Sequence, residues 1–320
     1  MLEKHHYTAP LPPEAQQAEA RRGLFSAMAA FLLWGCLPLY WKLLQAVPAF
    51  EILCHRIIWS FFGIVLVLLF RSELGRALTS LKDKKILLTL VASGLLLTSN
   101  WFLFIYAITS DRVIETSLGY YTTPILNMCM GVFFLKERTN LAVWASLGFA
   151  TFGILFQLFA LGHLPWLALG LAVTFAVYGF LRKIVVVDAL TGLMVETAIV
   201  FLPCLAYVIF LDTNGSGAFH FGTGNADQMT INALLIVAGF VTTLPLFFFT
   251  YAARRISLTA LGLMQYISPT ITFLIGLFVF KEDFTLARLV TFACVWTAIA
   301  IYTADSLRHH HARTHPKPGK

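Results

Sequence analysis

The chain has 320 residues, of which 58% are hydrophobic and 12% are charged, and its formal net charge is +7. So little polar surface cannot cover a water-soluble globule of this length, so the composition excludes a soluble protein and predicts one embedded in a lipid bilayer. A helix needs about 20 apolar residues to cross the hydrocarbon core. Ten such spans are predicted, at about residues 24–43, 50–70, 86–107, 113–135, 141–160, 164–181, 190–211, 231–251, 257–280 and 286–304.

The Lys and Arg residues orient these ten spans, because cytoplasmic loops carry an excess of positive charge. With the N-terminus inside, 18 of the 23 Lys and Arg residues fall on the cytoplasmic side. Both termini are then cytoplasmic tails, at residues 1–22 and 306–320. Attraction to inner-leaflet lipids accounts for the net charge, so no nucleic-acid partner is expected. A solvated tail, rather than a metal site, is the interpretation of the C-terminal histidines, which are His309, His310, His311 and His315.

Several enzymatic motifs are missing from the sequence. It contains no Gly-x-x-x-x-Gly-Lys-Ser/Thr nucleotide loop, no His-Glu-x-x-His zinc helix and no Gly-x-Ser-x-Gly elbow. The five cysteines all fall inside predicted spans and show no Cys-x-x-Cys spacing, which argues against disulfides and structural zinc. We therefore expect no metal, no cofactor and no enzymatic activity.

Ionisable residues open the second predicted span. A charged side chain at mid-bilayer costs about 2.5–3.5 kcal/mol, so such residues usually face a polar interior and mark a pathway. Glu51 and His55 are four residues apart on one helical face and are candidates for sharing a proton. Glu51 and Arg56 have an alternative interpretation, because side chains this close to the outer end also reach headgroups or pair locally.

A repeat links the two parts of the chain. Tyr121 to Glu137 recurs 145 positions later as Tyr266 to Glu282, with six identities in 17 positions. A division near residue 162 gives two halves, residues 23–161 and 162–305, with five spans each. An odd number of spans inserts the second half upside down, so Lys136 is expected inside and Lys281 outside. Inverted repeats of this kind are typical of alternating-access carriers.

Proline and glutamate positions add to this pattern. Helix breaks are predicted at five prolines within spans, of which Pro124 and Pro269 occupy matched positions near the centres of the two halves. Carriers place interrupted helices around their substrate in this way. Glu196, nearly two turns into the seventh span, lies at the mirror position of His55. The predicted proton-coupling set is therefore Glu51, His55 and Glu196.

Aromatic and amide side chains within the spans are candidates for lining a cavity that holds organic solutes. Two alternatives stay open, an aromatic belt at the membrane interface and polar bridges between helices. The full predicted cavity set is Trp34, His55, Arg56, Asn100, Trp101, Tyr121, Pro124, Asn127, Tyr178, Glu196, Gln265, Tyr266 and Pro269.

Several runs carry a family resemblance, namely LLWGCLPLYWK, EILCHRIIWSFF, SNWFLFIYAI, ETSLGYYTTPILN, TFAVYGFLRK and LMQYISPTITFLIG. They resemble the RarD-type branch of the EamA family in the drug/metabolite transporter superfamily, over about residues 24–304. The resemblance implies an all-α carrier of the inner membrane with ten transmembrane helices in two repeats. It also implies that helices one to four and six to nine surround a central cavity, while five and ten lie at the periphery.

The resulting hypothesis is a secondary transporter, a permease or exporter, that moves small metabolites or drugs by alternating access. An intramembrane enzyme acting on a lipid-soluble substrate and a passive channel are the alternatives. The expected partners are a small-molecule substrate and membrane lipids. The sequence does not decide the substrate, the direction of movement, the coupling ion, or whether the protein is a monomer or a homodimer.

Overall fold

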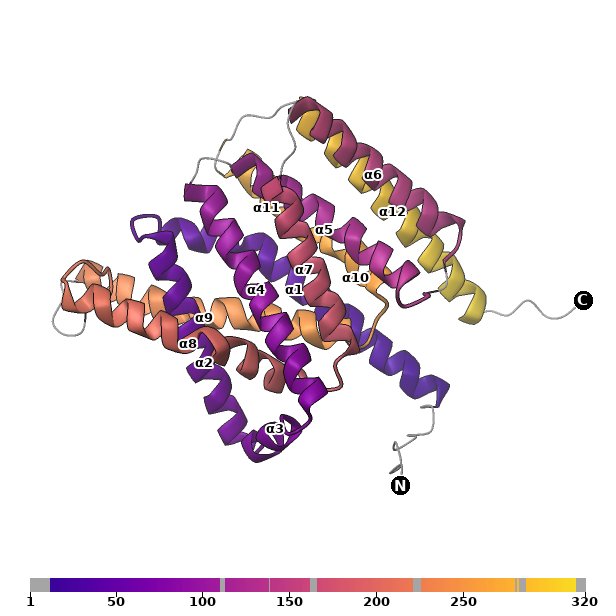
Figure 1. Ribbon diagram of the computed structural model, residues 1–320. Helices are drawn as coiled ribbons and strands as arrows, with labels where there is room; N and C mark the ends of the chain where they lie inside the picture. Colours follow the sequence, from indigo (N-terminus) through magenta and orange to yellow (C-terminus); the bar gives the residue numbers. More distant parts are fainter. Residues whose placement is uncertain are drawn as a thin grey trace, which may run out of the picture.

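The computed structural model describes residues 12–109, 113–137, 139–161, 166–220, 226–279, 281 and 286–314. Within these residues the secondary structure consists of twelve helices and no strand (Figure 1). The helices are α1 (Pro13–Leu43), α2 (Ala49–Phe70), α3 (Leu74–Ser80), α4 (Lys84–Thr109), α5 (Val113–Phe133), α6 (Leu141–Leu161), α7 (Trp166–Ile184), α8 (Ala189–Thr213), α9 (Ala226–Ala253), α10 (Leu258–Gln265), α11 (Ile267–Phe278) and α12 (Leu286–Thr314).

Each predicted span overlaps one helix, except the ninth, which is divided into α10 and α11. Seven helices in the described residues are long and apolar enough to cross a membrane, namely α1, α2, α4, α6, α7, α8 and α9. Helix α3 joins α2 to α4 and was not predicted. At the two ends of the chain, α1 begins at Pro13 and α12 continues to Thr314, so helix extends into both predicted tails. His315 lies outside the described residues.

The prolines behave differently from the prediction. Only Pro269 coincides with a break, because α10 ends at Gln265, whose carbonyl lies four residues before the missing N–H. In α5, Pro124 lies inside a continuous helix, where Thr122 and Thr123 donate to the carbonyls four residues before them. The prediction of a helix break is likewise wrong at Pro38, Pro203 and Pro245.

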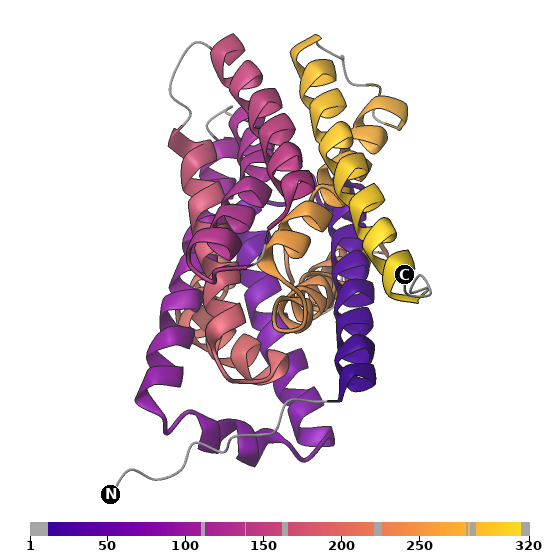
Figure 2. The ribbon, with the colours of Figure 1, turned by 90° about the vertical axis from the view of Figure 1, so that its right-hand side faces the viewer.

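The helices form one bundle with a separate pair along its side. Helices α6 and α12 pack against each other; they lie along one edge of the bundle in Figure 1 and on the side that faces the viewer in Figure 2. In the main bundle α1 packs on α9 and α11, α7 packs on α4 and α5, α2 packs on α8 and α9, and α5 packs on α10. We call the end that carries α3 the α3 end, and the end that carries residues 214–220 the opposite end.

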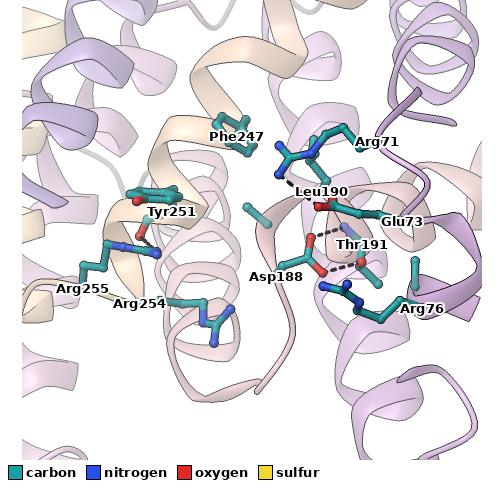
Figure 3. A pocket seen from close by; sticks show the side chains of 12 residues that line it. Arg71, Glu73, Arg76, Asp188, Leu190, Thr191, Phe247, Tyr251, Arg254 and Arg255 are labelled. Atoms are coloured by element: carbon teal, nitrogen blue, oxygen red, sulfur yellow. Dashed lines mark hydrogen bonds and ion pairs between the residues drawn. The ribbon is translucent and has the colours of Figure 1, made fainter. Parts of the chain in front are cut away.

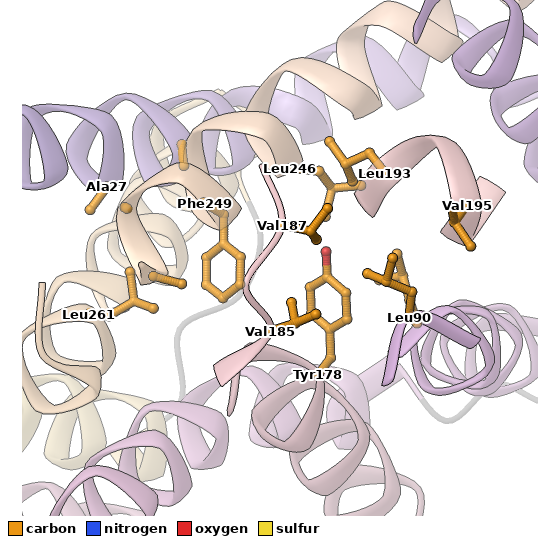
Figure 4. Packing of buried hydrophobic residues seen from close by; sticks show 14 of the residues in the cluster. Ala27, Leu90, Tyr178, Val185, Val187, Leu193, Val195, Leu246, Phe249 and Leu261 are labelled. Carbon is orange, nitrogen blue, oxygen red and sulfur yellow. The ribbon is translucent and has the colours of Figure 1, made fainter. Parts of the chain in front are cut away.

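Apolar side chains lie both inside the bundle and on its outer surface. The largest internal cluster surrounds Tyr178, whose ring stacks on Phe249 with centroids 6.1 Å apart (Figure 4). On the outside, Phe70, Leu141 and Phe159 keep 81%, 85% and 83% of their surface exposed. A soluble monomer rarely exposes apolar patches on this scale, whereas a lipid-facing surface requires them. The structure is that of a multi-pass membrane protein.

Gly239 lies where α9 packs on α2, and a substitution at this position measures how closely the two helices pack. A Cβ at this position would come 2.5 Å from Trp59 Cβ and 2.7 Å from the backbone nitrogen of Ser60. We expect Gly239→Ala to destabilise the protein by about 1–3 kcal/mol, because the two backbones must move apart. Thermal unfolding in detergent measures this loss. The control is Gly148→Ala on α6, where a Cβ meets nothing within 4 Å; equal effects of the two substitutions would contradict this packing.

Candidate functional site

A buried ionic cluster joins three helices towards the α3 end of the bundle. Glu196 of α8 is 2% exposed and Arg182 of α7 is fully buried, and Arg182 Nε lies 3.7 Å from Glu196 Oε1. Ser93 Oγ of α4 donates to the same carboxylate oxygen at 2.5 Å, and the hydroxyl of Tyr178 donates to Oε2 at 3.3 Å. The cluster therefore connects Glu196 and Tyr178, which were predicted to line a cavity, with Arg182, which was not.

The position of Arg182 depends on a glycine in the facing helix. A Cβ on Gly192 of α8 would lie 1.7 Å from Arg182 Nη1, so a larger residue would displace the guanidinium from its present position. Nη2 donates to the carbonyl of Ala189 at 3.3 Å, while Nε and Nη1 have no hydrogen-bond partner among the described residues. From the sequence, Arg182 was counted among the Lys and Arg residues at the cytoplasmic ends of the spans. No sequence pattern indicated that it pairs with Glu196, 14 residues later.

Arg56 lies in a second, aromatic setting towards the opposite end. Its guanidinium carbon is 4.9 Å from the ring centre of Trp41 on α1 and 5.0 Å from that of Trp101 on α4. Its Nε donates to Thr242 Oγ1 of α9 at 2.9 Å. Arg56 and Trp101, both predicted to line a cavity, are thus brought together, and Trp41 and Thr242 were missed.

Glu51 and His55 lie together beneath the loop at the opposite end. Glu51 is 1% exposed, and its Oε1 accepts hydrogen bonds from the backbone nitrogens of Ala218 at 2.6 Å and Phe219 at 3.4 Å. His55 Nε2 is 4.0 Å from the same oxygen, and the imidazole packs on Phe219. Neither His55 nitrogen has a hydrogen-bond partner among the described residues. Glu51 therefore anchors this loop to α2.

The loop contact gives a direct prediction for Glu51→Ala. Losing the carboxylate leaves the buried backbone donor of Phe219 and the part-buried donor of Ala218 without an acceptor, and an unpaired buried donor costs about 1–3 kcal/mol. We expect hydrogen exchange at Ala218 and Phe219 to accelerate, while the same amides stay protected in the control Glu73→Ala, whose carboxylate pairs with exposed Arg71. Unchanged protection in Glu51→Ala would contradict the anchoring role.

The predicted amides bridge helices. Asn100 of α4 donates to the carbonyl of Leu171 at 2.8 Å and to Thr174 Oγ1 at 2.9 Å, both on α7. Asn127 of α5 donates to Gln265 Oε1 of α10 at 2.8 Å. The second bridge joins the helix that contains Pro124 to the helix that ends before Pro269. These contacts match the bridging alternative and place the amides between neighbouring helices of the bundle.

Three of the predicted aromatic side chains pack inside the protein. Trp34 of α1 contacts the rings of Phe175 and Phe249. Tyr121 is 6% exposed and packs edge-on against Phe292 of α12, with centroids 5.3 Å apart. Tyr266, at the junction of α10 and α11, is fully buried, and its hydroxyl has no hydrogen-bond partner among the described residues.

A cavity of about 210 Å³ opens at the α3 end, next to the buried cluster (Figure 3). Asp188 in its wall caps α8 by accepting from the backbone nitrogen of Thr191 at 2.9 Å. Burial and the neighbouring charge of Arg182 lower the pKa of Arg254, which lies beyond the end of α9. Four arginines and two carboxylates line the cavity, which are Arg71, Arg76, Arg254, Arg255, Glu73 and Asp188.

Glu137 lies outside the predicted site, and its partners are on a helix, 121 and 122 residues away in the sequence. Its carboxylate accepts from the backbone nitrogens of Leu258 at 2.6 Å and Thr259 at 3.0 Å, so it caps the N-terminus of α10. Lys136, just before it, has a φ of 51°, and Lys281, its counterpart 145 residues later, has a φ of 55°. The same left-handed turn thus recurs at the repeated Lys. Glu282 lies outside the described residues.

Comparisons with known proteins agree with one another. A model of the EamA-like transporter family matches residues 21–159. Protein RarD of Escherichia coli (strain K12) is 40% identical over 289 residues, which cover 90% of this chain and 96% of the relative. The uncharacterized transporter YojE of Bacillus subtilis (strain 168) is 38% identical over 296 residues, covering 92% and 97%. A crystal structure with 19% sequence identity superposes with a TM-score of 0.64, covering 90% of this chain and 98% of the other, and so has the same fold.

Proposed function

Since the chain belongs to the EamA-like transporter family, in its RarD-type branch, we propose that it is a secondary transporter that moves small metabolites or drugs across the cytoplasmic membrane by alternating access. In this proposal ten membrane-crossing units form two inverted repeats. The first comprises α1, α2, α4, α5 and α6, and the second comprises α7, α8, α9, the pair α10 and α11, and α12.

The observation that carries this proposal is a packing pattern that survives exchange of the two repeats. Exchange turns the α1–α9 contact into α7–α4, the α1–α11 contact into α7–α5, and the α2–α9 contact into α8–α4. The contacts α2–α8, α5–α10 and α6–α12 turn into themselves. The repeated sequence segment, whose two copies are 145 positions apart, gives the same division of the chain. Together they support two equivalent units that rock about a shared interior.

The orientation follows from charge in the same proposal. The α3 end carries Arg71, Arg76, Arg254 and Arg255, so it faces the cytoplasm by the positive-inside rule. Both termini are then cytoplasmic. Glu196 is the proposed proton-coupling residue at this end, and His55, with Glu51 beside it, is its counterpart towards the opposite end.

The test is counterflow in proteoliposomes. A thermal-shift screen of amino acids, nucleosides, amphenicols, quaternary amines and aromatic acids first selects a solute. Vesicles preloaded with that solute are then tested for uptake of its radiolabelled form. A carrier accumulates label transiently and saturates with concentration. Conversion of the solute to a product would indicate an enzyme instead, and flux that rises without saturation would indicate a pore.

A further inference from the structure

Arg56 is a charged residue in the interior of the bundle, and no acidic side chain in the described part of the chain pairs with it. It lies in the second turn of α2, about 10 Å along the helix from its first residue. Its contacts among the described residues are the rings of Trp41 and Trp101 and the hydroxyl of Thr242, and none of them carries a negative charge. The other interior arginine, Arg182, faces Glu196. An unbalanced arginine inside a membrane protein is a functional-site candidate.

The contacts of Arg56 fix its guanidinium without using all of its donors. Thr242 holds Nε, and the two tryptophan rings flank the guanidinium, which restricts its rotation. The hydrogen bond to Thr242 occupies only one of the five N–H donors of the guanidinium. These are the donors that bind a carboxylate or phosphate group in a bidentate manner.

The neighbour Tyr120 indicates open space beside this arginine. Tyr120 of α5 lies within electrostatic range of Arg56 and keeps 41% of its surface accessible. The guanidinium of Arg56 lies between α1, α4 and α9, so accessible surface on Tyr120 beside it borders a space between these helices. Arg56 is itself partly accessible. Among the described residues, α1, α4 and α5 contribute aromatic rings to this space and α2 contributes the guanidinium.

We propose that this space binds an organic anion with a flat apolar body, whose acidic group pairs with Arg56 and whose body packs against Trp41 and Trp101. This inference rests on the proposed transport function and names its substrate class. A cation is repelled by Arg56, and a neutral solute leaves the guanidinium uncompensated in a medium of low polarity. An acid instead supplies the missing charge together with acceptors that match the planar fork.

The purely structural alternative is that the tryptophans alone stabilise Arg56 as a packing element. Cation–π contacts contribute about 0.5–2 kcal/mol each in that case, and solute charge has no influence on binding. The two interpretations therefore differ in one measurable property. Only a binding role makes affinity depend on the charge of the solute through Arg56.

The experiment uses the full-length protein and three solutes of matched shape, namely phenylacetate, phenylacetamide and phenethylamine. Thermal shift gives apparent affinities, and counterflow gives half-saturation concentrations. We expect wild type to bind phenylacetate most tightly. In Arg56→Gln the half-saturation concentration for phenylacetate is expected to rise about tenfold or more, because a charge-assisted hydrogen bond is lost. The half-saturation concentration for phenylacetamide is expected to stay within about twofold of the wild-type value. Arg56→Lys is expected to be intermediate, because it keeps the charge and loses the fork.

Two further variants guard against misfolding and general charge effects. Thr242→Val keeps the guanidinium but removes its anchor on Nε, so a smaller, acid-selective loss is expected. Arg22→Gln removes a charge from an exposed arginine paired with Glu19 on α1 and is expected to leave the affinity for all three solutes unchanged. Should Arg56→Gln fail to fold, Thr242→Val alone decides, and an equal loss for acid and amide there would overturn the assignment.

The outcomes separate this inference from the transport proposal. Saturable exchange of the amide or amine that does not depend on Arg56, with no preference for phenylacetate, would overturn the anion assignment while transport itself stands. Stabilisation by phenylacetate that requires Arg56, without saturable exchange of any of the three solutes, would support the binding site and contradict the carrier.

Discussion

Glu196→Gln is expected to lower the initial rate of counterflow by at least about tenfold and to flatten its dependence on pH. Glutamine keeps the shape of the side chain and one carbonyl oxygen, so it can accept from Ser93 or from Tyr178, which donate to different oxygens of the carboxylate, but not from both. It binds no proton and no longer balances the charge of Arg182. A tenfold change corresponds to about 1.4 kcal/mol of activation free energy, which is small beside the roughly 3–5 kcal/mol that removing one partner of a buried ion pair costs.

Rates must be normalised to the amount of inserted protein, because loss of the carboxylate also lowers stability. The matched control is Glu14→Gln, the same substitution at an exposed glutamate in the first turn of α1 and outside the cavity, where transport and its pH response are expected to be unchanged. A Glu196→Gln protein that transports at the wild-type rate with a wild-type pH response would remove Glu196 from the proposed mechanism.

Arg182→Met is expected to destabilise the protein by about 3–5 kcal/mol, because it leaves the Glu196 carboxylate buried without its counter-charge. The thermal unfolding midpoint in detergent should fall sharply. Methionine fills much of the volume of the arginine stem, so a cavity is a minor part of the loss. The effect therefore reports on charge more than on packing.

The double variant Arg182→Met with Glu196→Gln separates these contributions. Removing both charges together is expected to restore most of the midpoint, since a buried ion pair often contributes little net stability over neutral replacements. The coupling between the two substitutions should exceed about 1 kcal/mol. Destabilisation of the double variant by the sum of the two single effects would mean that the residues do not act as a pair.

The sequence predicted the positions of the helices well, because long apolar segments in a membrane protein have few alternatives to helix. The family was also predicted correctly. Hydropathy marks lipid crossings rather than helix ends, which explains why helical residues 13–22 and 306–314 and the short α3 were missed. Hydroxyl bonds to carbonyls four residues earlier occur beside both matched prolines, from Thr122 and Thr123 near Pro124 and from Thr270 near Pro269, so they do not explain why only Pro269 coincides with a break.

The candidate sites were harder to predict, because each depends on contacts between distant segments. Arg182 and Glu196 meet where Gly192 leaves space for the guanidinium beside α8, and no spacing rule signals that contact. Glu51 lies beside His55, as predicted, yet its carboxylate accepts hydrogen bonds from backbone nitrogens of a loop 167 residues away in the sequence. Arg56 was predicted as a cavity residue because it is a charged residue within a span. Its contacts with Trp41 and Trp101 could be found only from the fold, because the three residues lie on different helices.

The central claim is that the two halves cross the membrane in opposite directions. The five native cysteines, none of them in a disulfide, are first replaced, and single cysteines are then placed at the exposed positions Lys136 and Lys281. A membrane-impermeant maleimide applied to spheroplasts is predicted to label residue 281 directly and residue 136 only after lysis. Labelling of both positions from the same side of the membrane would contradict the account.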